Sequence, residues 1–379
     1  MHLVSLRNCL LFVCSVLFFA SCVDNEKKTV TPGSDSLSIN RAAVLTAIAD
    51  DIVIPAYANF KAKLDNMISY SNKFTNQPDT ANLHKYRTAW EDAYIEWQKV
   101  QQFEFGPAET HATINFVNLF PTNTATIYNN ISSGTANLEI SGNYAAQGFP
   151  AMDYLINGLA STDESIVSFY TTDTLATKRI AYLNKLNDQI LLKINQVNNE
   201  WATYRSSFVA NTGVSASSSM SLLVNGYVHN YERYLRAGKF GIPAGATTKV
   251  QVPEKVEAFY KKNISQKLAK ASHQAAVDFF NGKSVKTGTE GKSIKTYLDG
   301  LGAKDSQTNQ SLSSIVNAQF VVNNAAIDAM EGNFYNIVKT NNSQMIATYN
   351  ELQKVVKMLK VDMTSAMSIT ITYNDNDGD

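Results

Sequence analysis

The clearest pair of side chains that could share a metal ion is His229 and Glu232, in the stretch HNYE. Residues three apart on a helix project from one face, so an imidazole nitrogen and a carboxylate oxygen can reach the same ion. Arg233 follows the pair directly. The alternative is a partly exposed histidine with ordinary hydrogen-bond partners, and the sequence leaves both interpretations open. His111 with Glu109 forms a further pair, which is more typical of a loop than of a site.

A second stretch of interest is GFPAMDYLING, residues 148–158. Proline has a fixed φ and no amide hydrogen, which suits the first helical position, so Pro150 predicts the start of a helix. Asp153 then lies near the helix N-terminus, where exposed amides and the helix dipole favour a carboxylate. On this interpretation the motif is a well-started helix. The functional alternative is that Asp153 contributes a ligand or a hydrogen-bond acceptor to a pocket.

Other kinds of chemistry lack their motifs in this sequence. There is no Gly-x-Ser-x-Gly elbow, no phosphate-binding glycine-rich loop and no HExxH zinc motif. The 33 basic and 33 acidic residues give a formal net charge of zero, so the chain has no basic field of the kind that nucleic-acid binding needs. We therefore expect a small ligand, an ion or another protein as the partner, and no nucleic acid.

The N-terminus predicts export and lipid attachment. Arg7 precedes an apolar run from Leu10 to Ala20, which is too short for a comfortable membrane span and ends in small residues. The run FFASC resembles a bacterial lipobox, so we expect a signal peptide at residues 1–21 and a lipid on Cys22. A plain signal anchor with an unmodified cysteine is the alternative. Residues 22–39 are polar and without periodicity, which predicts a flexible tether.

Hydrophobic periodicity indicates helices over most of the remaining chain. One apolar stripe has steps of four and multiples of four, and a second alternates steps of three and four. Further stripes extend over 83–103, 220–235, 256–280, 312–338 and 345–359, whereas 238–253 and 282–291 are typical of loops. The sequence therefore predicts an all-α fold. The first stripe is Val44, Ile48, Ile52, Phe60, Leu64 and Ile68, and the second is Leu183, Leu186, Ile190, Ile194, Val197, Trp201, Tyr204 and Phe208.

Two pairs of similar segments suggest an internal duplication. FGPA at 105–108 matches FGIPA at 240–244, and in both GFPAMDYLING and GKSIKTYLDG a glycine precedes Tyr-Leu by six positions. Each match is short, so coincidence is the alternative. Together they predict two four-helix-bundle-like domains, at residues 40–208 and 209–379, with a cleft between them.

Several segments carry a resemblance to a known family. In order and approximate spacing, AWEDAYIEWQKVQQFEFGPAE (89–109), LFPTN (119–123), GFPAMDYLING and the terminal YNDNDGD resemble the imelysin-like family. The resemblance implies an exported bacterial protein with two helical-bundle domains, associated with iron uptake and once classed as a metallopeptidase. It also implies a Gly-x-His-x-x-Glu motif near the domain interface. Here Gly148 matches the glycine, Pro150 replaces the histidine and Asp153 replaces the glutamate.

The sequence therefore predicts a lipid-anchored binding protein of the cell envelope, on the periplasmic face or the cell surface of the outer membrane. We expect it to be non-catalytic and to serve iron or other nutrient uptake, together with other uptake-system proteins. The alternatives are a metallopeptidase with a divergent metal site and a surface glycan- or protein-binding lipoprotein. The expected ligand is a small molecule, a metal such as iron or zinc, or a chelate. It would bind at the interdomain cleft near Gly148, Pro150, Asp153, His229, Glu232 and Arg233, with Asp153, His229 and Glu232 as candidate metal ligands.

Overall fold

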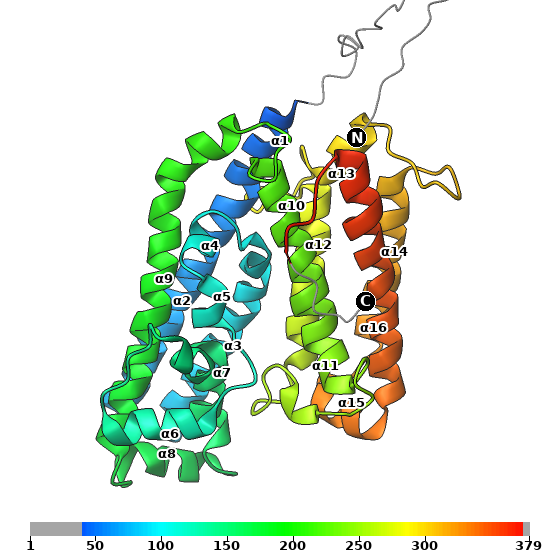
Figure 1. Cartoon of the computed structure of the whole chain (residues 1–379). Coiled ribbons are helices and arrows are strands. Elements are labelled where there is room, and N and C mark those ends of the chain that lie inside the picture. The colour runs from blue at the N-terminus through cyan, green and yellow to red at the C-terminus, as the bar shows by residue number, and fades with distance from the viewer. Residues whose placement is uncertain (1–39, 374–379) are drawn as a thin grey trace, which may run out of the picture. The chain divides into compact units, whose positions relative to one another are not determined.

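The computed structural model describes residues 40–373, and this part of the chain is predominantly helical (Figure 1). Within it, extended pairing is limited to the isolated bridges Lys283–Glu290 and Lys304–Ser311. The prediction of an all-α fold is confirmed. The expected signal peptide, the tether and the lipid-bearing Cys22 lie outside the described residues.

The elements before residue 211 pack around the long helices α2, α3 and α9. Short helices α4 to α8 connect α3 to α9. The label η denotes π- or 3₁₀-helical turns. The elements are α1 (Arg41–Ala47), η1 (Ile48–Val53), α2 (Ile54–Asn76), α3 (Thr80–Val100), η2 (Gln101–Phe103), α4 (Pro107–Thr110), α5 (Thr113–Val117), α6 (Thr124–Ser133), η3 (Ser141–Ala146), α7 (Gly148–Asp153), η4 (Tyr154–Gly158), α8 (Asp163–Thr171) and α9 (Ala176–Ala210).

The elements after residue 218 pack around the continuous helix α10–η5–α11 and around α12, α14 and α16. Figure 1 shows these helices beside the first group, and α3 and α12 are in direct contact between the two. The duplication into two bundles stays a prediction. The elements are α10 (Ser219–His229), η5 (Asn230–Gly241), α11 (Ile242–Ala244), η6 (Pro253–Lys255), α12 (Ser265–Asn281), α13 (Ile294–Gly300), α14 (Leu312–Asp328), α15 (Phe334–Thr340), α16 (Asn342–Lys357), η7 (Met358–Met363) and α17 (Thr364–Met367).

The predicted apolar stripes form the core. On α9, the stripe that begins at Leu183 is buried apart from Tyr204, which is half-buried. The continuous helix Arg41–Asn76 is long and apolar enough to cross a membrane by length and composition alone. Half of its most apolar window is buried inside the protein, where α2 packs against α3 and α9. Its apolar face is therefore accounted for by the core.

Three sequence-predicted element boundaries differ from the structure. Residues 256–264 form turns rather than the start of a helix, because Ala258 and Lys262 adopt left-handed φ values of 56° and 62°. Residues 238–244, predicted as loop, continue the helix to Ala244. The helix predicted over 312–338 is divided into α14 and α15 by residues 329–333.

Candidate functional site

The start of α7 is set by glycine rather than by proline. Gly148 has a φ of 75°, and a Cβ built on it would lie 2.3 Å from the carbonyl oxygen of Val117. No other residue type fits both the conformation and the contact. Pro150 is the third residue of α7 and not the predicted first, but it still lies in the first turn, where a missing amide hydrogen costs nothing.

Asp153 ends α7, so its carboxylate does not meet the N-terminal amides of its own helix as predicted. It is 1% exposed and accepts hydrogen bonds from the backbone amides of Tyr260 and Lys261, at 2.9 and 3.0 Å, and from Asn157 Nδ2 at 3.0 Å. Burial raises the pKa of Asp153 to about 7, against the opposing effect of these donors. The carboxylate thus fastens α7 to a loop of the second half of the chain.

A pocket of about 280 Å³ opens beside Pro150 and Asp153. Its walls come from both halves of the chain, and they combine aromatic and aliphatic side chains with few polar groups. Such a pocket can bind a small ligand, although it lies at the lower end of the usual size range. The lining residues are Phe120, Pro121, Thr122, Pro150, Asp153, Glu254, Val256, Ala258, Phe259 and Tyr260.

A buried polar network lies directly behind this pocket. Glu257, between two pocket-lining residues, is ion-paired with Lys239, and both side chains are at most 3% exposed. Asn118 Nδ2 and the Tyr94 hydroxyl donate to Glu257 Oε1 at 2.8 and 3.1 Å, and Lys239 Nζ donates to Gln98 Oε1 at 2.8 Å. Burial lowers the pKa of Lys239, and the charge of Glu257 opposes that shift.

Sequence reasoning missed this network. Tyr94 also stacks on Phe149 of α7, with ring centroids 4.6 Å apart and planes within 5° of parallel. The one available signal was the four-residue spacing of Tyr94 and Gln98, which places both on one face of α3. The network therefore links α3, α7 and the second half of the chain behind the pocket.

His229 and Glu232 do not meet Asp153. Glu232 is 4% exposed, and its two oxygens accept from Lys360 Nζ at 2.9 Å and from the Tyr373 hydroxyl at 2.7 Å. The His229 ring packs on Tyr373, with centroids 4.6 Å apart, and its pKa is lowered by burial and then by the charge of Arg233. The carboxylate of Glu232 is therefore already fully engaged within the protein.

The segment that contributes Tyr373 forms residues 368–373, which we call the C-terminal segment. It is bound to α10 by Asn225, whose side chain donates to the Thr370 carbonyl at 3.0 Å and accepts from the Thr372 amide at 2.8 Å. Figure 1 shows it running along α10. The HNYE stretch is thus covered by this segment.

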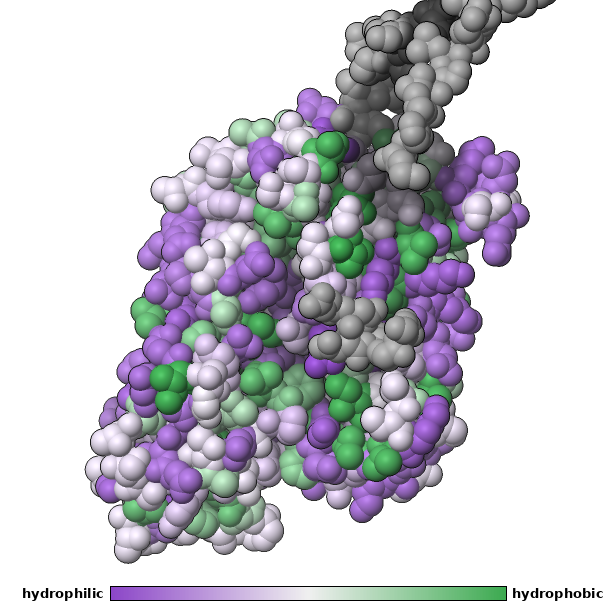
Figure 2. Space-filling view, viewed as in Figure 1, coloured by the Kyte–Doolittle hydropathy of each residue, from purple (hydrophilic) through white to green (hydrophobic). Residues whose placement is uncertain are grey.

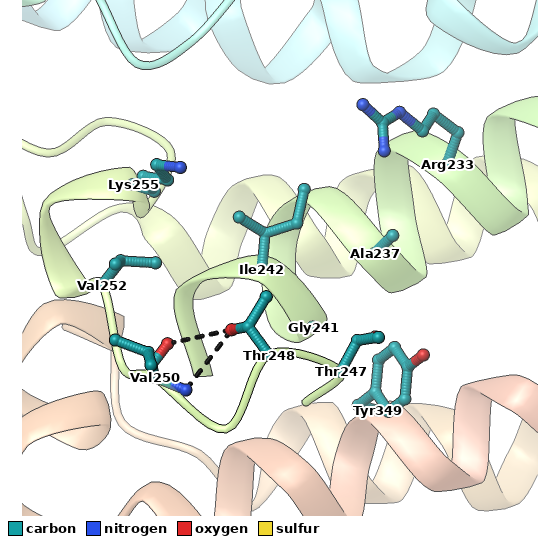
Figure 3. A pocket seen from close by; sticks show the side chains of 10 residues that line it. All are labelled: Arg233, Ala237, Gly241, Ile242, Thr247, Thr248, Val250, Val252, Lys255 and Tyr349. Carbon is teal, nitrogen blue, oxygen red and sulfur yellow. Dashed lines mark hydrogen bonds between the residues drawn. The ribbon is translucent and has the colours of Figure 1, made fainter. Parts of the chain in front are cut away.

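Arg233, the sixth sequence-predicted site residue, lies at a different pocket. That pocket is about 400 Å³ in volume and shares no lining residue with the one beside Pro150 (Figure 3). The structure therefore brings Gly148, Pro150 and Asp153 together at one pocket. His229 and Glu232 lie elsewhere, beside Arg233, whose side chain lines the second pocket. Figure 2 shows that polar and apolar side chains are interspersed over the visible face of the protein.

The remaining histidines of residues 40–373 have structural partners. His111 Nε2 lies 2.6 Å from Glu200 Oε1, so the predicted pairing with Glu109 is wrong. His84 Nε2 contacts the Asp163 carboxylate near the surface. His273 is fully buried between the Tyr231 hydroxyl and the Phe320 carbonyl, and burial lowers its pKa to about 4.

No group of three or more His, Cys, Asp or Glu side chains that could hold a metal ion occurs within residues 40–373. At the α7 position in particular, residue 150 offers no donor atom and both oxygens of Asp153 are taken by hydrogen bonds. The residues present there do not fit a protein-bound metal ion, which needs several converging free donors.

Comparisons with known proteins identify the family to which this chain belongs. A peptidase M75 family model described as imelysin matches residues 53–359. An imelysin-like protein from Psychrobacter arcticum 273-4 superposes with a TM-score of 0.67 at 16% identity, covering 90% of this chain and 99% of that one. A protein from Parabacteroides distasonis ATCC 8503, proposed to be an iron-regulated protein A precursor, superposes with a TM-score of 0.71 at 16% identity, covering 89% and 97%. None of the curated proteins matches. With the family model covering most of its length, the chain belongs to the imelysin family.

Proposed function

We propose that this protein is a non-catalytic, lipid-anchored binding protein that takes a small ligand into the pocket beside Pro150 and Asp153, in an iron or other nutrient acquisition system. The proposal rests on one observation, which is how the Asp153 carboxylate is hydrogen-bonded. Its two oxygens accept three hydrogen bonds, two of them from backbone amides of the opposite half of the chain. A carboxylate used in this way builds the wall of a pocket and leaves at most one of its about four lone-pair directions for a metal.

The metallopeptidase alternative requires more than this site offers. Catalytic zinc needs about three protein ligands and an open position for an activated water. Pro150 supplies no ligand, and Glu232 is bound to Lys360 and Tyr373 instead. The pocket is better suited to a ligand that makes apolar and aromatic contacts, with Thr122 and Glu254 as polar groups.

The link to iron rests on two supports. One is the resemblance of the motif segments to proteins associated with iron uptake, and the other is the description of the structural neighbour from Parabacteroides distasonis. In this proposal iron enters the pocket within a chelate, as cargo and not as a resident cofactor. The anchor rests on FFASC before Cys22, and Cys22→Ser should give unprocessed or soluble protein. A variant that stayed fully processed and membrane-bound would remove the anchor from the proposal.

Elemental analysis tests the proposal most directly. Protein purified without added metal or chelator should hold far less than one zinc or iron per chain, and it should show no peptide hydrolysis above a buffer blank. The double variant Pro150→His with Asp153→Glu supplies the donors that the family motif has, and should raise metal affinity above that of the parent. Pro150→Ala with Asp153→Glu is the matched control without the imidazole. Stoichiometric metal in the parent, lost in Asp153→Asn or His229→Ala, would establish the metalloprotein alternative.

A further inference from the structure

The pocket at Arg233 has a preformed wall, and the charged side chains that line it are all positive. Arg233, Ala237 and Gly241 are spaced four residues apart along η5 and line one side. The opposite side is the loop 245–252, and Tyr349 of α16 closes the base. This pocket is distinct from the one beside Pro150, so a ligand bound here is independent of the proposed function.

Hydrogen bonds and close packing hold the loop in place without a ligand. Gly245 has a φ of 69°, and a Cβ there would lie 2.3 Å from the Val250 carbonyl oxygen. The Ala246 amide donates to the Gly241 carbonyl at 2.9 Å, and the Val252 amide donates to the Pro243 carbonyl at 2.9 Å. A wall that is already ordered costs little further entropy when a ligand binds.

Two cations face the pocket and no acid balances them. Figure 3 shows Arg233 and Lys255 on either side of Ile242, with their charged ends towards the same open space. Neither charged group forms a hydrogen bond or an ion pair with any side chain or carbonyl of residues 40–373, and no lining residue is acidic. By contrast, many surface lysines of this chain are paired, as in Lys61–Asp65 and Lys270–Asp328.

The remaining lining is apolar or neutral. Ile242, Val250 and Val252 present aliphatic surface between the two cations, and the Thr248 hydroxyl is engaged with the backbone of Val250. An arginine guanidinium binds carboxylate or phosphate through parallel hydrogen bonds, and a nearby lysine adds a second charge. The volume of about 400 Å³ is within the range of small-molecule sites.

We propose that this pocket binds a small organic anion, whose carboxylate or phosphate is held between Arg233 and Lys255 while its apolar part lies against Ile242 and Val250. Two opposed requirements define the ligand. It must carry a negative charge, and it must also have an apolar or ring-shaped body that inorganic anions lack.

The test is calorimetric titration of the purified mature protein with four probes: benzoate, phenyl phosphate, inorganic phosphate and benzyl alcohol. At least one of the two organic anions should bind with one-to-one stoichiometry in the millimolar range or tighter, and more tightly than both inorganic phosphate and the neutral alcohol. Which organic anion binds better distinguishes a carboxylate from a phosphate ligand. Raising the salt concentration should weaken the binding, because both cations are exposed.

Single variants locate the binding. Arg233→Gln and Lys255→Gln should each weaken the organic anion about tenfold, as expected for the loss of one charge-assisted contact. Both side chains are exposed, so circular dichroism should show unchanged folding. Lys85→Gln, an exposed cation on α3 away from the pocket, is the matched control and should bind as the parent does.

Three outcomes would overturn the proposal. The first is that neither organic anion binds at about 10 mM, a concentration that would reveal even a weak site. The second is that inorganic phosphate binds as tightly as phenyl phosphate, because the apolar lining would then contribute nothing. The third is that both pocket variants retain the affinity of the parent.

Discussion

Replacing Asp153 by asparagine should change the pH dependence of stability in a defined direction. Burial raises the pKa of this carboxyl from 3.8 to about 7 in the folded protein, while the unfolded chain keeps the ordinary value. Between those two values the folded protein binds the proton more strongly than the unfolded chain does. The stabilising contribution of the protonated group is therefore fully present below about pH 3.8 and is lost as the pH rises through about 7.

The magnitude follows from the same two pKa values. One pKa unit corresponds to about 1.4 kcal/mol, and integration from about pH 5 to about pH 7.5 gives a loss of about 2–3 kcal/mol in the free energy of unfolding. Asp153→Asn removes this ionisable group and no other. The stability advantage of the parent over the variant should thus shrink by about 2–3 kcal/mol between those pH values.

Urea denaturation of both proteins at several pH values measures this difference, because the titrations of all other groups cancel. Asp50→Asn is a control of opposite sign: the hydrogen bond from Arg205 lowers the pKa of Asp50, so the parent's advantage there should grow with pH before it levels off. If the advantage over Asp153→Asn also grew with pH, the amide donors of Tyr260 and Lys261 would outweigh burial, and the raised pKa would be wrong.

Three further perturbations test the packing around the site. Gly148→Ala should lower the free energy of unfolding by about 3 kcal/mol or more in urea denaturation. Gly134→Ala is the control, because Gly134 has a similar φ of 73° but a Cβ there would meet no atom within 4 Å, and it should cost about 1 kcal/mol. Equal costs would contradict the backbone contact at Gly148. Glu257→Gln should lower the free energy of unfolding by about 3–5 kcal/mol, because it leaves Lys239 buried without its counter-charge. Adding Lys239→Met should restore at least half of that loss. If stability were not restored, the unpaired charge would not be the cause of the loss. Asn225→Ala should speed amide hydrogen exchange in the C-terminal segment, and unchanged protection would show that this side chain does not hold it.

The helices were predictable because their signal is local. The α9 stripe is visible as apolar residues three and four apart, and those residues are the ones that are buried. The helix predicted to begin at residue 256 was wrong because the conformation of residues 256–264 is not set locally. Ala258 and Lys262 adopt left-handed conformations that neither residue type favours, so the tertiary contacts of the loop impose them and the sequence carries no sign of them.

The site was predictable only in part for a similar reason. Gly148 and Asp153 stand out by type and spacing, but two of the three groups that bind Asp153 are backbone amides 107 and 108 residues away, and every residue except proline has such an amide. The ion pair of Lys239 with Glu257 was missed because nothing local distinguishes a buried pair from two solvated charges. Long-range partners of this kind become visible only in the folded structure.

The way α7 is held has a consequence for how such a site can evolve. Gly148 fixes where the helix begins, and Asp153 fixes the loop beside it, so the side chain of residue 150 is not needed to shape the backbone of the motif. Each histidine codon differs from one proline codon by a single base. A substitution at residue 150 can therefore exchange a ring without donor atoms for an imidazole, or the reverse, while Gly148 and Asp153 keep the backbone of the motif in place. The chemistry that residue 150 offers is then separable from the fold that presents it.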